Sequence, residues 1–196
     1  MRFAAIVLAA GCASRMGENK LVAQVGGKAI VRWAAEAAVA SKAAPVIVVT
    51  GYERERVESA LAGLGVAIVH NARYADGMST SLKAGLASLP PGVEAAAILL
   101  GDMPEVDGAL VDKLVAALEG GKQIAIPVRD GRQGNPVVWA RALFPALAKV
   151  EGDHGAKSVI AAHRAVVAEV PAGASAFSDV DTPDALAALR ARQKGV

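Results

Sequence analysis

Residues 3–20 read FAAIVLAAGCASRMGENK: an apolar run, a loop of small residues, and two cations within that loop. The run Phe3–Leu8 is apolar at every position, which predicts a strand covered on both faces. The small residues that follow would let a ligand approach the backbone closely, and their amides can receive a phosphate or a base edge. Arg15 and Lys20 add a forked and a flexible cation. The loop therefore suits a polyphosphate.

Other phosphate-binding motifs do not fit this loop. A dinucleotide fingerprint needs glycine two positions after Gly11, where the chain has Ala13. A P-loop needs Gly-Lys followed by Ser or Thr, whereas Gly27-Lys28 is followed by Ala29. A plain strand-to-helix turn with surface cations is the remaining alternative. We favour an anion site because both cations lie in one short loop.

Composition limits the kinds of protein that this chain can be. Its 196 residues suit one domain, which we expect to span residues 1–196, and 54% of them are hydrophobic, enough for a sizeable core. Lys and Arg number 21 against 19 Asp and Glu, a formal charge of +2, and aromatic residues make up 4%. Without a basic excess or a stacking surface, no nucleic-acid partner is expected.

Cysteine usage and hydropathy bear on the compartment. The single cysteine, Cys12, cannot form an internal disulfide and fits a reducing compartment, so we expect a cytoplasmic protein. The sequence Leu-Ala-Ala-Gly-Cys that ends there also matches a bacterial lipoprotein leader. We interpret it as a strand and loop instead, because the apolar run is short and only one arginine precedes it. No apolar stretch approaches the roughly 20 residues that cross a bilayer, so no membrane partner is expected.

Short apolar runs alternate with Ala-rich segments of helical spacing, which is typical of an α/β fold. The predicted strands are Phe3–Leu8, Val46–Thr50, Val66–Val69, Ala96–Leu100, Gln123–Val128, Pro136–Trp139 and Val166–Val170. The predicted helices are Ile30–Ser41, Arg54–Leu61, Ser79–Leu89, Gly108–Leu118, Ala142–Val150, Ala156–His163 and Pro183–Arg192. Right-handed crossovers would place the loops that follow the strands along one sheet edge, where ligands of open α/β sheets bind.

Asp102 follows directly after the apolar run Ala95–Leu100, in the sequence Gly101-Asp102-Met103-Pro104. A strand that ends at an aspartate presents a carboxylate at the sheet edge. There Mg²⁺ can be bound by one or two protein oxygens, with phosphates and waters as the other ligands. Capping of a turn would explain an isolated Asp-Met-Pro equally well. A single aspartate holds a divalent ion weakly, so a partner carboxylate is expected elsewhere in the chain.

The segment Leu8–Lys20 resembles the L-A-A-G-x-x-x-R-M-G-x-x-K signature of the MobA-like nucleotidyltransferases, in particular the branch that attaches a nucleotide to molybdopterin. The resemblance implies a three-layer α/β/α Rossmann-like domain with a mostly parallel mixed sheet. It also implies that the backbone at Leu8, Ala9, Ala10 and Gly11 holds the base. Arg15 and Lys20 would hold the triphosphate and act in catalysis with Asp102. The chain departs from the commonest form at Ala13, where a serine is frequent.

The resemblance extends to the metal ligands. Gly101–Pro104 resembles the family's metal-binding G-D-M-P, in which Gly101 and Asp102 also contact the nucleotide. Asp179–Pro183 resembles its D-x-D-T-P, whose second acidic position completes the magnesium site. This implies Mg²⁺ held by Asp102 and Asp181, with Asp179 as the alternative ligand. Because a helix is expected to begin at Thr182-Pro183, capping of that helix is the competing role for Asp181.

Two further resemblances concern the substrates. Gly77–Gly85 resembles the nucleotide-binding G-M-x-x-S-L-x-x-G, with Gly77 and Ser81 as the best matches. Hydroxyls at a helix N-terminus can bind a ribose, base or phosphate, although helix capping explains one of them. Gly134–Val137 and Gly152–Lys157 resemble the family's acceptor-side G-x-P-V and G-D-x-G-A-K/R. The acceptor-binding residues that these motifs imply are Asn135, Pro136, Gly155 and Lys157.

The family transfers a nucleotide from a triphosphate to a phosphorylated acceptor and releases pyrophosphate. Ala10 matches the L-A-A-G form linked to cytidine transfer, whereas the guanosine branch usually has L-A-G-G. The resemblance thus implies that CMP passes from CTP to molybdopterin, the activity of a molybdenum cofactor cytidylyltransferase, in a monomer that transiently contacts an apo-molybdoenzyme. Three alternatives stay open: a guanylyltransferase, a transferase for another phosphorylated acceptor, and a carrier or chaperone for the cofactor.

Overall fold

A computed structural model of the chain describes residues 1–11, 19–152 and 156–194. The strands of its main sheet are β1 (Phe3–Ala9), β4 (Val46–Thr50), β5 (Ala67–His70), β6 (Ala95–Leu100), β7 (Ile124–Arg129), β8 (Arg132–Gln133), β9 (Val137–Ala140) and β10 (Val167–Pro171). A separate hairpin pairs β2 (Gln24–Val25) with β3 (Lys28–Ala29). The α-helices are α1 (Ile30–Ala40), α2 (Arg54–Ala60), α3 (Met78–Ala87), α4 (Gly108–Ala116), α5 (Phe144–Leu147), α6 (Lys157–Ala162) and α7 (Pro183–Lys194). Short 3₁₀ helices are η1 (Lys20–Val22), η2 (Tyr74–Asp76), η3 (Glu119–Gly121), η4 (Arg141–Leu143), η5 (Arg164–Val166) and η6 (Ala174–Phe177).

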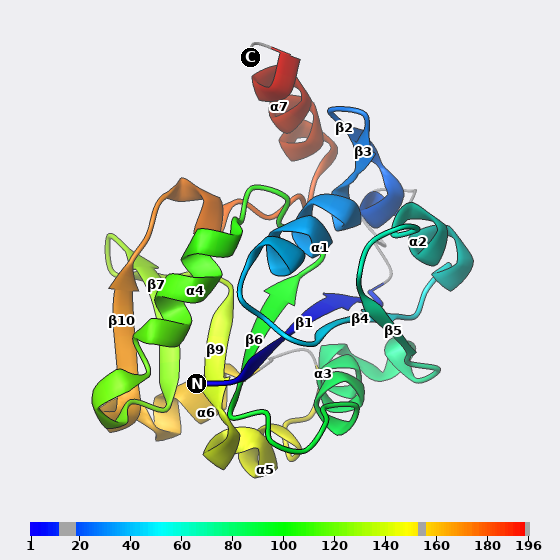
Figure 1. Ribbon diagram of the computed structural model, residues 1–196. Coiled ribbons are helices and arrows are strands. Elements are labelled where there is room, and N and C mark those ends of the chain that lie inside the picture. Colours follow the sequence, from blue (N-terminus) through cyan, green and yellow to red (C-terminus); the bar gives the residue numbers. More distant parts are fainter. Residues whose placement is uncertain (12–18, 153–155, 195–196) are drawn as a thin grey trace.

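The main sheet is mixed but mostly parallel. Its strands lie in the order β10-β7-β9-β6-β1-β4-β5, and β8 pairs with β7 at the side of this path. Neighbouring strands are parallel except where β9 meets β6 and β7 and where β8 meets β7. Figure 1 shows helices on both sides of this sheet, with α7 and the β2–β3 hairpin projecting beyond one end. The predicted fold, a three-layer α/β/α domain with a mostly parallel mixed sheet, is confirmed.

Strand β1 shows why the sheet is covered on both faces. Ala5 and Val7 belong to the core under α1, α2 and α4, whereas Ile6 belongs to the core under α3, α5 and α6. All three side chains are fully buried. Because successive side chains of a strand point to opposite faces, an uninterrupted apolar run needs a helical layer on each side.

The order of the strands creates a switch point beside β1. The chain passes from β1 to β4 and β5 on one side of the sheet and then returns to β6 on the other side. Residue pairing from Phe3↔Ala95 to Leu8↔Leu100 joins the parallel strands β1 and β6. The segments that follow these two strands therefore leave the sheet side by side, at the position where open α/β sheets bind their ligands.

Most predicted strands and helices are present with ends shifted by a few residues. The helix predicted over Ala142–Val150 is instead η4 followed by the single turn of α5, with Pro145 in the first turn. The β2–β3 hairpin and the 3₁₀ helices were not predicted. Helix α7 begins as predicted, because the Ala185 amide donates a 3.1 Å hydrogen bond to Oγ1 of Thr182. No helix in the described part of the chain is long and apolar enough to cross a membrane.

A small third core joins α7 to the hairpin. Leu186 and Leu189 of α7 pack with Val25, Ile30 and Val180. The Arg190 Nε of α7 also donates a 2.9 Å hydrogen bond to the carbonyl oxygen of Gln24. This contact brings a segment late in the chain against the hairpin that follows the first loop.

Candidate active site

Gly101 sets the distance between the ends of β1 and β6. Its amide donates a 2.9 Å hydrogen bond to the Leu8 carbonyl oxygen. A side chain at Gly101 would begin 3.0 Å from that oxygen and 3.3 Å from both the Ala9 Cβ and the Leu21 Cδ2. The position favours glycine because the two backbones approach closely. As a result, Asp102 emerges directly beside the end of β1 and beside η1.

Lys20 is the first residue of η1, and its ammonium group joins two distant segments. The Asn19 Oδ1 accepts a 3.1 Å hydrogen bond from the Leu21 amide and so caps this short helix. The Lys20 Nζ lies 2.7 Å from Oδ2 of Asp102 and 2.5 Å from Oδ1 of Asp181. The Lys20 and Asp102 side chains are 16% and 19% exposed, and that of Asp181 is 47% exposed. The two carboxylates predicted as metal ligands thus converge, with a cation between them.

The charges of this cluster interact strongly, but only one of the two Asp102 carboxylate oxygens contacts the lysine. Burial by itself would lower the pKa of Lys20, but the Asp102 and Asp181 carboxylates together outweigh it and raise that pKa above its ordinary value. Asp102 uses Oδ2 for the lysine, while its Oδ1 is buried and has no hydrogen-bond partner among the described residues. An unpaired buried acceptor costs about 1–3 kcal/mol, more when it is charged. The cluster therefore has a place for another donor or cation.

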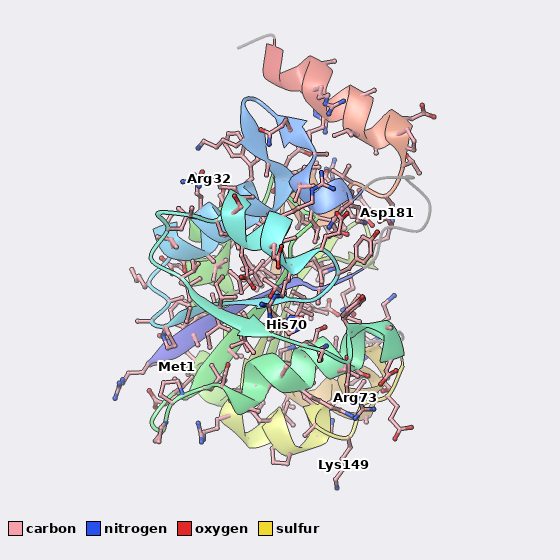
Figure 2. The ribbon with its side chains drawn as sticks, turned by 90° about the vertical axis from the view of Figure 1, so that its right-hand side faces the viewer. Met1, Arg32, His70, Arg73, Lys149 and Asp181 are labelled. Carbon is pink, nitrogen blue, oxygen red and sulfur yellow. The ribbon has the colours of Figure 1, made fainter. Side chains whose placement is uncertain are left out.

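Asp181 reaches this cluster because its own segment is fixed to Asp102. The Val180 amide donates a 3.1 Å hydrogen bond to the Asp102 carbonyl oxygen. Thr182, rather than Asp181, provides the side-chain cap of α7. Figure 2 shows Asp181 at the base of α7. The capping role that competed with metal binding for Asp181 is thus filled by its neighbour.

Asp179 stands behind Asp181. Although the residue is largely exposed, partial desolvation of its carboxyl raises its pKa, and the charges of Asp181 and Asp102 and a hydrogen bond with Asp181 raise it further. A hydrogen bond to its own backbone opposes this shift. Asp179 therefore adds negative charge next to Asp181, while Asp181 makes the direct contact with Lys20.

The other end of the same edge is packed more tightly. The Ala10 carbonyl oxygen accepts a 3.1 Å hydrogen bond from the Tyr52 amide. A side chain on Gly51 would begin 2.6 Å from the Tyr74 Cβ and 2.8 Å from the Ala10 Cβ. The Tyr52 and Tyr74 rings are tilted by 58° to each other, with their centroids 6.3 Å apart. Of the small residues predicted to hold the base, Ala10 is buried and Gly11 is exposed.

Asn71 organises the start of α3. It is 6% exposed, and its Nδ2 donates hydrogen bonds of 2.8 Å to the Thr80 Oγ1 and 2.9 Å to the Ser81 Oγ. Its Oδ1 accepts a 3.0 Å hydrogen bond from the Arg73 amide. The Ser81 hydroxyl, predicted to meet the nucleotide, is therefore already an acceptor for Asn71. Gly77 takes a φ of 106° at the helix start, a conformation that favours glycine.

The predicted acceptor residues lie in two places. The Asn135 amide donates a 2.9 Å hydrogen bond to the carbonyl oxygen of Ala176 in η6, a few residues before Asp179, and Pro136 is buried. Lys157 is exposed at the start of α6. Near that segment, the Gly152 carbonyl oxygen accepts a 3.2 Å hydrogen bond from the Ser79 amide of α3. The predicted residues Arg15 and Gly155 lie outside the described part of the chain.

Several residues of this edge were not singled out from the sequence. Asn71, Gly51 and Tyr52 each come just after a strand, which is the signal that identified Asp102. Asn19 also escaped notice, although it immediately precedes Lys20. Its buried Nδ2 has no hydrogen-bond partner within residues 1–11, 19–152 and 156–194. Applying the same rule to β4 and β5 would have found the first three.

The carboxylates of this edge can bind a metal ion that needs few protein ligands. Among the described residues, no group of three or more His, Cys, Asp and Glu side chains is arranged to hold one. Asp102 and Asp181 supply two carboxylates around one cationic position, and the Asp102 Oδ1 is an unpaired buried acceptor. Two carboxylates fit Mg²⁺, which usually takes few protein ligands and completes its shell with phosphates and waters.

The fold and this edge define a nucleotidyltransferase. The MobA-like NTP transferase domain model matches residues 5–167, and the chain belongs to that family. Among curated relatives, the molybdenum cofactor cytidylyltransferase of Escherichia coli K12 is 28% identical over 184 residues, which are 91% of this chain and 91% of that protein. The bifunctional protein GlmU of Sorangium cellulosum is 28% identical over 169 residues, 83% of this chain. The chain spans only 36% of that GlmU.

Solved structures agree on the fold. The homologue of Rv0371c from Mycobacterium sp. strain JC1 superposes with a TM-score of 0.88 at 28% identity, covering 100% of this chain and 99% of the other. Rv0371c of Mycobacterium tuberculosis H37Rv, solved in complex with manganese, superposes with a TM-score of 0.81 at 24% identity, covering 97% and 99%. These similarities establish the nucleotidyltransferase fold over nearly the whole chain.

Proposed function

We propose that this protein transfers CMP from CTP to the terminal phosphate of molybdopterin, forming molybdopterin cytosine dinucleotide and releasing pyrophosphate. The observation that carries the proposal is the convergence of Asp102, Asp181 and Lys20 where β1 and β6 end. Two carboxylates and a cation at a switch point suit a metal-bound triphosphate. The E. coli relative, similar over 91% of both chains, supports molybdopterin as acceptor and cytidine as base.

In the proposed reaction, an oxygen of the acceptor phosphate forms a bond to the α-phosphorus of CTP. The bond from that phosphorus to the bridging oxygen breaks, and its electron pair leaves with pyrophosphate. The acceptor phosphate is ionised near neutral pH, so no residue of the chain needs to act as a strong base. Orientation and charge neutralisation are then the main contributions of the protein.

The residues have separate tasks in this mechanism. Asp102 and Asp181 would hold Mg²⁺, which supplies charge neutralisation at the phosphate oxygens when it is bound. Lys20 and Arg15 would stabilise the negative charge that develops on pyrophosphate. Leu8–Gly11, Gly77, Ser81 and Gly101 would form the nucleotide side. Asn135, Pro136, Gly155 and Lys157 would form the acceptor side.

The base preference rests on Ala10. Its methyl group is buried against the Gly51–Tyr74 contact, so a larger base would have to fit beside a packed wall. We expect CTP to be used in preference to GTP for this reason. Another phosphorylated acceptor is the main alternative.

The test is a competition among substrates. The protein is incubated with molybdopterin, Mg²⁺ and all four nucleoside triphosphates, and mass spectrometry identifies the nucleotide joined to the pterin. The cytosine dinucleotide is expected, with stoichiometric pyrophosphate. Equal incorporation of GMP and CMP would refute the base assignment, and pyrophosphate release only with other phosphorylated acceptors would refute the acceptor.

A carrier role is separated by one variant. If Asp102→Ala stops pyrophosphate release but still binds the dinucleotide and passes it to an apo-molybdoenzyme, then handover is a second activity. A wild-type protein that binds the dinucleotide but forms none under any condition would replace the transferase proposal with the carrier role.

A further inference from the structure

The contacts of Lys20 with Asp102 and Asp181 are not compatible with the binding of a metal ion between those two residues. In the proposed function, which this inference rests on, Lys20 binds the triphosphate and a divalent ion lies between Asp102 and Asp181. In the structure the Lys20 Nζ itself lies between those carboxylates, at 2.7 and 2.5 Å. A second cation in the same place would be repelled at close range.

We propose that the Lys20 ammonium and the divalent ion are alternative occupants of the space between Asp102 and Asp181, so that Lys20 selects a metal–nucleotide complex over the free ion. A free ion has to expel the ammonium and leave it without an anion. A triphosphate that arrives with the ion offers phosphate oxygens to the expelled ammonium. Metal and nucleotide therefore bind with positive coupling, and each tightens the other equally.

The surroundings make Lys20 the movable partner. The backbone of η1 is held by the Asn19 cap and by Leu21, which is 4% exposed. Asp102 is fixed by Gly101 against Leu8 and by the hydrogen bond from the Val180 amide to its carbonyl oxygen. The long lysine side chain can change rotamer without moving either backbone. Exchange of the cation thus needs a side-chain movement only.

The unpaired oxygen of Asp102 gives the exchange a starting point. Lys20 occupies Oδ2, and Oδ1 is buried without a hydrogen-bond partner in the part of the chain that the structure describes. A carboxylate that holds one cation on one oxygen can receive another on the second. The two short contacts of the Lys20 ammonium, 2.7 Å to Asp102 and 2.5 Å to Asp181, are the interactions that a free ion has to replace.

The experiment measures binding of Mn²⁺ alone, by the electron paramagnetic resonance signal of the free ion, to wild type, Lys20→Met and Lys28→Met. Lys28→Met is the matched control, because it removes the same charge from a lysine outside the cluster. Lys28 lies on the neighbouring hairpin, and its Nζ is 2.7 Å from Oε2 of Glu36 in α1. We expect Lys20→Met to bind Mn²⁺ at least about tenfold more tightly than wild type, since a competing charge is gone. Lys28→Met should bind like wild type.

The same titration is repeated with a CTP analogue that carries a methylene group between its α- and β-phosphorus atoms. In wild type the analogue should tighten Mn²⁺ binding by a larger factor than in Lys20→Met, because only wild type has an ammonium to relocate. Equal Mn²⁺ affinities of wild type and Lys20→Met in the absence of nucleotide would overturn the proposal.

Two further measurements keep the outcome decisive. Lys20→Gln, whose amide can still donate to both carboxylates, replaces Lys20→Met if the latter does not fold. In wild type, nitrogen-15 NMR of the Lys20 ammonium should show it leaving the carboxylates when Mg²⁺ saturates the site, and an unchanged signal at saturation would refute the exchange. Pyrophosphate release with an intact substrate set tests the proposed function separately, because it can persist when this inference fails.

Discussion

The candidate site has two ends along the sheet edge, a charged end with Lys20, Asp102 and Asp181 and a hydroxyl end with Asn71, Thr80 and Ser81. The polar groups of these two ends find their partners in different ways. Near α7, the Lys20 ammonium contacts both the Asp102 and the Asp181 carboxylates. The Asp102 Oδ1 has no hydrogen-bond partner among the described residues. Near α3, the Asn71 amide donates to Thr80 and Ser81 and accepts from the Arg73 backbone. Figure 2 shows Asp181 and Arg73 on opposite sides of this edge.

This difference separates an exchangeable part of the site from a preset one. A charged cluster with an unpaired oxygen can replace one cation by another when a triphosphate receives the expelled ammonium. A buried neutral network in which both amide protons are used has no such freedom, and breaking it leaves several groups without partners. We infer that substrate binding rearranges the charged end and meets a fixed surface at the hydroxyl end.

The largest expected effect is on the charged end. Asp102→Asn keeps the shape of the side chain but removes its charge, so pyrophosphate release should fall by roughly 10²–10³-fold, the usual cost of losing one group that stabilises developing charge. Asp112→Asn, which changes a surface aspartate that accepts a hydrogen bond from the Lys42 amide, is the control. Unchanged turnover in Asp102→Asn would remove this residue from the metal site.

The next prediction concerns stability at the hydroxyl end. Asn71→Asp cannot donate to Thr80 and Ser81, so the free energy of unfolding should fall by about 1–3 kcal/mol, as expected when buried groups lose their partners. Asp181→Asn should change that free energy by less than about 1 kcal/mol, because its side chain is 47% exposed and such pairs contribute little. Urea unfolding measures both. Equal losses would show that the two ends do not differ.

A finer test separates the two aspartates before α7. Asp181→Asn should weaken Mn²⁺ binding in the presence of the CTP analogue by about tenfold, roughly 1.4 kcal/mol. The reason is that the Asp181 carboxylate directly contacts the position that the Lys20 ammonium now occupies. Asp179→Asn should change it far less, since Asp179 contributes only neighbouring charge. Titration calorimetry provides the affinities. The reverse order would make Asp179 the ligand.

The smallest effect is expected at the surface ion cluster of Lys28, Arg32 and Glu36, which serves as a reference for the contribution of an exposed ion pair to stability. The hydrogen bond from Lys28 lowers the pKa of Glu36 below its ordinary 4.5, against the opposing effect of burial and with help from Arg32. A lowered folded-state pKa stabilises the protein above pH 4.5, and this stability is lost as the pH falls through the lowered value. Glu36→Gln should therefore cost about 0.2–1 kcal/mol at pH 7 and nothing once both states are protonated. Thermal unfolding from pH 7 to pH 3 measures this, and a difference that grew with acid would contradict it.

Sequence patterns predicted the layers and the edge because apolar runs and loop positions depend on local order. The strand β1 and the residues just after β6 were found in this way, whereas the pairing of Asp102 with Asp181 was implied by the resemblance to the family's D-x-D-T-P. The position of the Lys20 ammonium could not be predicted, because it depends on three segments meeting in space; Lys20 and Asp181 are 161 positions apart. The Asn71 network was not predicted for a different reason, because asparagine after a strand is also common in plain turns.

The small core of Val25, Ile30, Val180, Leu186 and Leu189 joins residues that the ribosome makes early to residues that it makes late. Lys20 and Asp102 are likewise made long before Asp181, so a growing chain that already has its main sheet still lacks the second carboxylate. In the proposed mechanism, the metal site would therefore be complete only after translation has passed Asp181.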